Sequence, residues 1–149
     1  MKMLFLPVVL VVALATACST TSNISDVTGK EWKLIEVYLD GKDTLFNRSD
    51  LPVGLADGFF VLNMDLEVIS GRAAPNLYSG PYTLGDKQSI SVMPMRTTMM
   101  ASFYQNDKLS EHDYVNYVQN AYKWNLVNGN REFLSKNQSV MDVKLVFSF

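Results

Sequence analysis

The chain has 149 residues, 48% of them hydrophobic and 19% charged, and its formal net charge at pH 7 is −2. This length fits one domain that can bury a core without cross-links, and the single cysteine excludes a disulfide within a monomer. The slightly acidic charge argues against nucleic acid as a partner, because phosphate backbones are bound by basic surfaces.

The N-terminal residues have the pattern of an exported bacterial lipoprotein. Lys2 supplies a charged start, an apolar stretch from Met3 to Ala15 follows, and small residues precede Cys18, the only cysteine. The apolar stretch is too short to span a membrane and is typical of a secretory signal. We therefore expect residues 1–17 to be a signal peptide and Cys18 to be lipidated. The alternative is ordinary cleavage near Ala17 with an incidental thiol.

A short tether is predicted between the lipid and the folded part. Residues 18–28 include the Ser- and Thr-rich stretch Ser19–Asp26, which has no apolar periodicity and is typical of a flexible linker. The folded domain then covers residues 29–149. Acyl chains on Cys18 would anchor it to a membrane, and Ser19, where an inner-membrane retention signal has Asp, favours the outer membrane of the cell envelope.

The first half of the domain is predicted to contain two strands separated by a long loop. Trp32–Leu39 is rich in aromatic and β-branched residues, which favour a strand. Residues 40–58 contain glycines and a proline among polar residues and predict a loop. Apolar and polar residues then alternate from Phe60 to Val68, which predicts a half-buried antiparallel strand that continues past a bend to Arg72.

A hairpin and one helix are predicted next. Tyr82–Leu84 and Ser89–Met95 flank a turn and should pair as antiparallel strands. From Ser110 to Tyr122 apolar residues recur every three or four positions, and Ser110 with Asp113 resembles a capping pair, so we expect a helix there. Its apolar stripe should be buried against the sheet, through Tyr114, Val118 and a residue near Ala121.

The C-terminal part is predicted to contain three strands. Tyr122–Val127 and Arg131–Ser135 flank the dipeptide Asn128-Gly129, which favours a tight hairpin turn. Apolar residues alternate in the last segment, from Val143 to Phe149, which predicts a final half-buried strand.

Several short motifs follow one another along the chain. They are Trp32 with Leu34, then Ser70-Gly71, then the spaced residues Asn76, Tyr78, Gly80 and Tyr82, then Thr98, Met100 and Ala101, then Glu111 at the helix start. Together they resemble the META domain of HslJ-type heat-shock lipoproteins, over roughly residues 29–149. The resemblance implies a single compact α+β domain in which a strongly bent antiparallel sheet packs around one helix. It also implies an envelope or stress role, and it supplies no catalytic residues.

The chain departs from that family at two positions. The family often has cysteines where this chain has Pro75 and Ser102. Their joint absence is expected if the two cysteines form a disulfide in relatives, because a single remaining cysteine would be an unpaired exported thiol. The resemblance therefore implies that Pro75 and Ser102 lie close together.

The residues Asn76, Tyr78, Gly80 and Tyr82 form the candidate site with the strongest signal. Glycine permits unusual backbone angles, and a tyrosine can pack its ring while its hydroxyl binds a partner. We favour a structural loop that fixes the bend of the sheet, with Asn76 hydrogen-bonded to nearby backbone and the rings packed. The alternative is a recognition surface, which requires exposed rings.

Four methionines in eight residues could bind soft Cu(I) through their sulfur atoms. Such a site needs several converging sulfurs, and packing of flexible side chains into gaps of the core explains methionines in predicted strands more simply. We therefore expect packing rather than metal binding at Met93, Met95, Met99 and Met100.

The remaining titratable residues give no sign of catalysis. His112 is the only histidine and lies in the first turn of the predicted helix, where it is expected to be solvated. Asp65 and Glu67 could form a carboxylate pair, but they fit the solvated side of a strand. We expect no metal, no cofactor and no enzymatic activity.

Two functions are compatible with these features. The first is a lipid-anchored envelope protein that binds another envelope component or supports envelope integrity under stress. The second is a carrier of a small apolar ligand within the curved sheet, suggested by the many Met, Phe and Tyr residues. An apolar cavity between sheet and helix would distinguish the carrier. The sequence gives no indication of the oligomeric state.

Overall fold

The computed structural model describes residues 28–102, 105–139 and 141–149, and about half of them lie in antiparallel strands. The strands are β1 (Glu31–Leu39), β2 (Asp43–Asn47), β3 (Val61–Met64), β4 (Val68–Arg72), β5 (Leu77–Leu84), β6 (Ile90–Val92), β7 (Arg96–Thr97), β8 (Ala121–Val127), β9 (Asn130–Lys136) and β10 (Asp142–Ser148). An α-helix, α1 (Glu111–Gln119), connects β7 to β8, and short 3-10 turns are η2 (Arg48–Asp50), η3 (Ala56–Gly58) and η4 (Asp86–Gln88).

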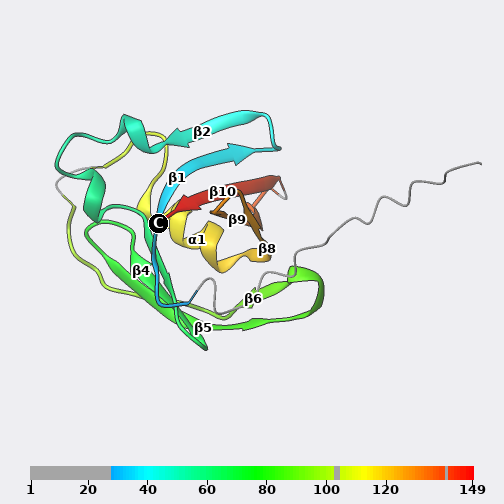
Figure 1. The fold of residues 1–149 in the computed structure, drawn as a ribbon. Helices are drawn as coiled ribbons and strands as arrows, with labels where there is room; N and C mark the ends of the chain where they lie inside the picture. Colours follow the sequence, from blue (N-terminus) through cyan, green and yellow to red (C-terminus); the bar gives the residue numbers. More distant parts are fainter. Residues whose placement is uncertain (1–27, 103–104, 140) are drawn as a thin grey trace, which may run out of the picture.

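The strands form one strongly curved sheet. Its order is β6-β5-β4-β3-β1-β10-β9-β8, with β2 added to β1 and β7 added to β5. A bridge between Ser89 and Lys123 joins the β6 and β8 ends, so the sheet is a nearly closed barrel. Figure 1 shows α1 within the curve of this sheet. The bent antiparallel sheet around one helix matches the expectation, but the domain is mostly sheet, which fits the predicted α+β class only loosely.

The predicted single strand from Phe60 to Val68 is wrong. The chain reverses at Asp65–Glu67, and β3 and β4 then pair with each other, with Met64 opposite Ile69. The amide of Asp65 donates to the carbonyl of Val68 at 2.9 Å and closes the turn. Leu66, expected on the buried face, is 77% exposed. A period of two continues unchanged through such a turn, so the alternation alone could not reveal it.

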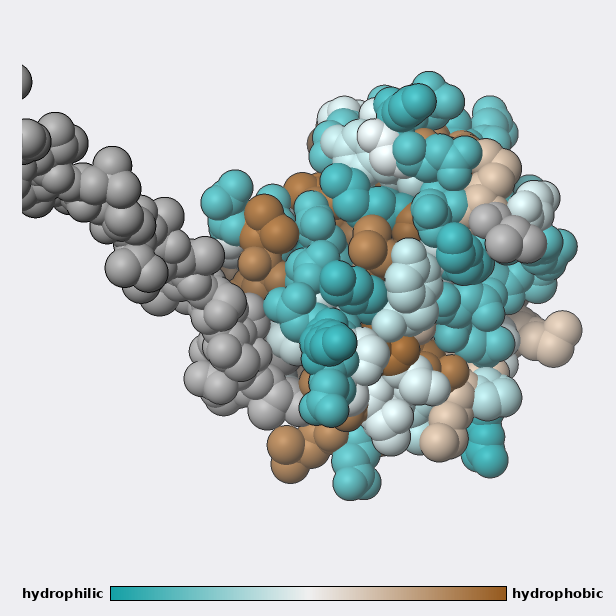
Figure 2. All heavy atoms as spheres, turned by 90° about the vertical axis from the view of Figure 1, so that its right-hand side faces the viewer, coloured by the Kyte–Doolittle hydropathy of each residue, from teal (hydrophilic) through white to brown (hydrophobic). Residues whose placement is uncertain are grey.

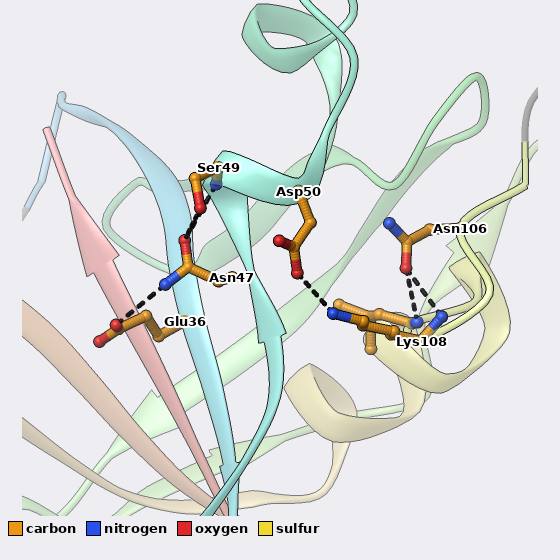
Figure 3. A network of polar contacts seen from close by, with 7 residues as sticks. Glu36, Asn47, Ser49, Asp50, Asn106 and Lys108 are labelled. Atoms are coloured by element: carbon orange, nitrogen blue, oxygen red, sulfur yellow. Dashed lines mark hydrogen bonds and ion pairs between the residues drawn. The ribbon is translucent and has the colours of Figure 1, made fainter.

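The predicted loop at residues 40–58 contains a strand, β2, which pairs with the second half of β1. The segment after β2 is held by Arg48, whose guanidinium donates to the carbonyls of Leu34, Ala56 and Phe59. Polar contacts also connect this region to its neighbours: Lys108 binds Asp50 at 2.8 Å, as Figure 3 shows.

The helix is confirmed in position and orientation but is shorter than predicted. The Ser110 hydroxyl accepts a hydrogen bond from the amide of Asp113 at 3.0 Å, as the capping pair indicated. Tyr114 and Val118 are fully buried. The helix ends at Gln119, because Ala121 already belongs to β8 and pairs with Ser135.

The C-terminal hairpin is confirmed. Asn128 and Gly129 both have positive φ angles, 51° and 82°, as the preferred two-residue hairpin turn requires. The last strand ends at Ser148, one residue earlier than predicted. Phe149 is largely exposed, and the edge of its ring contacts Trp32 with 5.1 Å between centroids.

The interior of the curve is filled by aromatic rings. Phe60 contacts Phe46 at 5.3 Å and Tyr114 at 5.0 Å between ring centroids. The ring of Tyr78 also contacts that of Tyr114, with 5.7 Å between centroids. These rings pack against one another in the centre of the space between sheet and helix.

One charged residue lies inside the core. Arg131, on β9, is fully buried, and its guanidinium lies 4.4 Å from the ring centroid of Trp32. Nη1 contacts the sulfur of Met64, whereas Nε and Nη2 have no hydrogen-bond partner in the described part of the chain. Burial lowers the pKa of Arg131 to about 10, which still leaves it charged at neutral pH.

We predict that Arg131→Met will increase the free energy of unfolding by about 1 kcal/mol or more, because a buried charge without a counter-charge costs more than an apolar side chain of similar length. Urea unfolding of both proteins measures the difference. Arg131→Ala is the control and should be less stable than the Met variant, since it leaves a cavity. A Met variant that is less stable than the original would show that the charge is compensated.

None of the helices in the described ranges has the length and apolar character that a bilayer crossing requires.

Candidate functional site

The predicted Asn76–Tyr82 loop is a strand for most of its length, since β5 begins at Leu77. Its side chains alternate between the two faces of the sheet: Tyr78 and Tyr82 are buried, whereas Leu77 and Ser79 are exposed. One strand therefore has an inner face that packs in the core and an outer face that is available for binding.

On the inner face, Tyr78 connects the sheet to the helix. Its hydroxyl donates to the carbonyl of Val61 at 2.8 Å and lies 2.9 Å from the hydroxyl of Tyr114. Because Tyr78 gives its single proton to Val61, Tyr114 must be the donor of the second bond. Burial raises the pKa of both hydroxyls, so both stay protonated.

Two glycines allow this packing. A Cβ atom on Gly71 would lie 1.9 Å from the carbonyl oxygen of Val61 and 2.5 Å from the hydroxyl of Tyr78. A Cβ atom on Gly80 would lie 2.8 Å from Cγ of Met95. Neither position has room for a side chain, so both glycines serve close packing.

Asn76 holds three segments together. Its side-chain oxygen accepts from the Thr98 hydroxyl at 2.9 Å and from the Met100 amide at 2.7 Å. Its side-chain nitrogen donates to the Met100 carbonyl at 3.1 Å and to the Glu111 carboxylate at 2.7 Å. Tyr82 likewise donates to the carbonyl of Asp65, at 2.6 Å. The predicted hydrogen bonds of Asn76 to backbone, and the packed tyrosine rings, are confirmed.

The outer face of the same strands carries a groove of about 490 Å³. Five polar residues form one row across the floor of this groove. Each is the register partner of the next on the neighbouring strand. Along the row from β1 to β7, they are Glu31, Asn63, Ser70, Ser79 and Arg96. Short amide and hydroxyl side chains in the middle can both donate and accept hydrogen bonds. Sequence reasoning missed this row, although its members occupy the outward positions between buried residues.

Two exposed arginines line the groove without an ion pair. Arg72 and Arg96 line it, and within the described residues no hydrogen bond or ion pair engages either guanidinium. Asp57, at the other wall, is paired with Lys33 at 2.9 Å. Glu31 is therefore the one groove carboxylate, among the described residues, without a cation bound to it. The lining thus has two arginines and two carboxylates, of which Asp57 is already neutralised by Lys33.

An apolar shelf of about 460 Å³ continues from the groove, sharing Arg72 and Leu77 with it. Half of the Leu77 side chain is exposed there. Two loop segments form much of this shelf, one around η3 and one after β7. Both lie at the left of Figure 1, coloured blue-green and yellow-green. Figure 2 views the molecule from the right-hand side, where hydrophobic residues occur in separate spots on a mainly hydrophilic face. The apolar members of the shelf are Leu55, Phe59, Ala74, Pro75, Leu77 and Met100.

The methionine expectation is only partly correct. Met95 packs against the core, but Met93 and Met100 are about half exposed and Met99 is 97% exposed. Three of the four are therefore surface residues, and all four lie after β6, which ends at Val92 rather than at Met95 as predicted.

The remaining titratable residues considered from the sequence, His112, Asp65 and Glu67, do not form a common site. His112 is exposed at the helix start, and its ring nitrogen lies 2.8 Å from the side-chain nitrogen of Asn116. Asp65 and Glu67 are exposed in the turn between β3 and β4, rather than on a strand face. No group of three His, Cys, Asp or Glu side chains is placed for metal binding within the described ranges.

Two predicted features remain predictions. Cys18, the signal peptide and most of the tether lie outside the described residues. The closeness of Pro75 and Ser102 is compatible with the structure, since Ala74 and Ser102 line one cavity and Asn76 binds Met100.

With its nearly closed antiparallel barrel around an α-helix, the described part of the chain has the fold of two solved structures. They are a protein from Burkholderia xenovorans (16% identity, 82% of this chain and 83% of that one covered, TM-score 0.56) and a DUF4847 family protein from Bacteroides vulgatus (11%, 85% and 96%, 0.55). No curated protein matches significantly. The META domain model matches residues 25–145, and the chain therefore belongs to the META domain family.

We predict that Tyr78→Phe will destabilise the domain more than Tyr114→Phe. The first change removes a donor to Val61 and the partner of Tyr114, whereas the second leaves Tyr78 bonded to Val61. Expected losses are about 1–3 kcal/mol for Tyr78→Phe and about 1 kcal/mol for Tyr114→Phe. Urea unfolding measures both. Equal losses, or a larger loss for Tyr114→Phe, would contradict this hydrogen-bond order.

Proposed function

We propose that this protein is a non-enzymatic binding protein of the bacterial cell envelope, lipid-anchored through Cys18, most simply to the outer membrane. Its outer-face groove binds another envelope component, and its inner face serves stability alone. The observation that carries this proposal is the polar row between Glu31 and Arg96, flanked by Arg72.

The groove supports binding for three reasons. Its floor presents hydrogen-bonding groups that the fold itself does not need, since Ser70 and Ser79 point away from the core. Its arginines form no ion pair within the described chain, which leaves their N–H groups available to a ligand. Its floor is built on paired strands, which hold these groups at fixed spacing. These features fit recognition rather than catalysis.

The lipid anchor supports the envelope location. Cys18 follows a charged start, an apolar stretch and small residues, and residues 18–28 give the domain a tether of up to about 35 Å when extended. Such a tether allows the groove to reach components at some distance from the membrane surface.

The carrier alternative receives no support from the interior. Ring contacts of Phe60, Tyr114 and Tyr78 occupy the centre of the space between sheet and helix. A cavity of about 420 Å³ lies at the helix start, but polar residues such as Asn106 and Glu111 line part of it, so it is not a continuous apolar cavity. The volumes of the groove and shelf lie on the outside of the sheet.

The anchor is tested with Cys18→Ser. The variant should incorporate no radiolabelled fatty acid and should leave the membrane fraction or remain uncleaved, because no thioether to lipid can form. Lys42→Gln, at an exposed turn of the domain, is the control and should be labelled like the original. Fatty acid that still enters Cys18→Ser would contradict the anchor.

The groove is tested by photo-crosslinking in living cells. A photoreactive phenylalanine analogue at Ser79, on the groove floor, should form adducts with another envelope component. The same analogue at Thr83 is the matched control, because Thr83 is also outward on β5 but does not line the groove. Equal adduct patterns at both positions, or none at Ser79, would contradict a binding role for the groove.

A further inference from the structure

Arg72 lies where the polar groove and the apolar shelf meet. It lines both, together with Leu77, which is its register partner across β4 and β5. Its Nη1 lies near Gly58 in the loop opposite, since a Cβ atom on Gly58 would be 3.2 Å from it. A cation thus lies between an apolar surface and a row of hydrogen-bonding groups.

We propose that this surface, within the binding function proposed above, captures the carboxyl-terminal segment of a partner protein. The α-carboxylate binds Arg72, and the last side chain, which is apolar, lies on the shelf against Leu55, Leu77 and Met100. The preceding peptide units lie over Ser70 and Ser79.

Charge and geometry favour a carboxylate at this point. An arginine presents two parallel N–H donors that match the two oxygens of a carboxylate. Arg72 has no such partner among the described residues, although the chain as a whole is acidic. Arg96 has none either, and strand spacing places its Cα roughly 12 Å from that of Arg72, within reach of an acidic residue upstream in the ligand.

The row of small polar side chains favours main chain as the rest of the ligand. A peptide presents alternating N–H and C=O groups, and Asn63, Ser70 and Ser79 can serve both. The shelf meets the groove at Arg72 and Leu77, so an apolar side chain on the shelf would lie directly beside the cation. The polar row, which matches main chain, favours a peptide terminus over a lipid.

The test uses the full-length protein, immobilised, and two pools of synthetic hexapeptides that end in Leu or Phe after five randomised positions. One pool has free carboxyl termini and the other has terminal amides. The free-acid pool should be retained about tenfold more strongly or better, since the amide removes the charge that Arg72 recognises. Equal retention of the two pools, or retention of neither, would overturn the proposal.

Variants connect the effect to the arginine. Arg72→Gln should reduce retention of the free-acid pool about tenfold, because the positive charge is lost. Arg72→Lys should reduce retention less, because the charge remains and only the bidentate hydrogen bonding to the carboxylate is lost. Lys42→Gln removes the same charge outside the groove and should change nothing. Retention that Arg72→Gln leaves unchanged would overturn the proposal.

Anionic phosphatidylglycerol vesicles separate a lipid from a peptide terminus. Vesicle binding that depends on Arg72, without retention of the free-acid peptides, would overturn the peptide proposal in favour of a lipid headgroup. If peptides are not retained but Ser79 still forms adducts in cells, the binding function stands and only this ligand class fails. If Ser79 forms no adducts either, both proposals fail.

Discussion

The buried hydroxyl of Tyr78 is the interaction on which the arrangement of the domain depends. It satisfies a backbone carbonyl of β3 and the hydroxyl of Tyr114 on the helix, at 2.8 and 2.9 Å. A buried hydroxyl without partners would cost about 1–3 kcal/mol, so the helix is held where the two hydroxyls meet. Gly71 is required beneath it, because any side chain there would collide with the Tyr78 hydroxyl.

The same strand then determines what the outside can do. Alternation along β5 turns Tyr78 and Tyr82 inward, so the residues between them must face outward. Register with β4 and β7 extends this outward set into the polar row that ends at Arg96. Stability and recognition therefore use opposite faces of one strand, and a change on one face need not damage the other.

Arg131 shows that the core is not built for maximal stability. Its charge is buried beside Trp32 and Met64 without a carboxylate among the described residues. Stacking over Trp32 contributes roughly 1–2 kcal/mol when the pair is shielded from water, which offsets only part of the desolvation cost. The nearly closed barrel tolerates this because the surrounding aromatic core is large.

Sequence signals that act locally predicted the structure well. The capping pair at Ser110 and the dipeptide Asn128-Gly129 each determine a backbone conformation through their own side chains, and both were confirmed. The roles of Asn76 and Tyr78 as packed, hydrogen-bonded residues were also predicted, because residue type limits what a buried amide or hydroxyl can do.

Features that depend on distant partners could not be predicted in this way. The strand β2 exists because β1 lies beside it, and the turn at Asp65–Glu67 is fixed partly by Tyr82, seventeen positions away from Asp65. The groove depends on the register of five strands, which no single segment encodes. The burial of Arg131 could not be predicted from its residue type, because arginine is mostly exposed in proteins.

The most direct test of the central claim is nuclear magnetic resonance detection of the Tyr78 hydroxyl proton in water. If the hydroxyl is buried and bonded to Val61 and Tyr114, its proton should exchange slowly with solvent, give a resolved signal and show cross-peaks to the Tyr114 ring. A hydroxyl proton that exchanges too rapidly to be seen, or one without contact to Tyr114, would contradict this account.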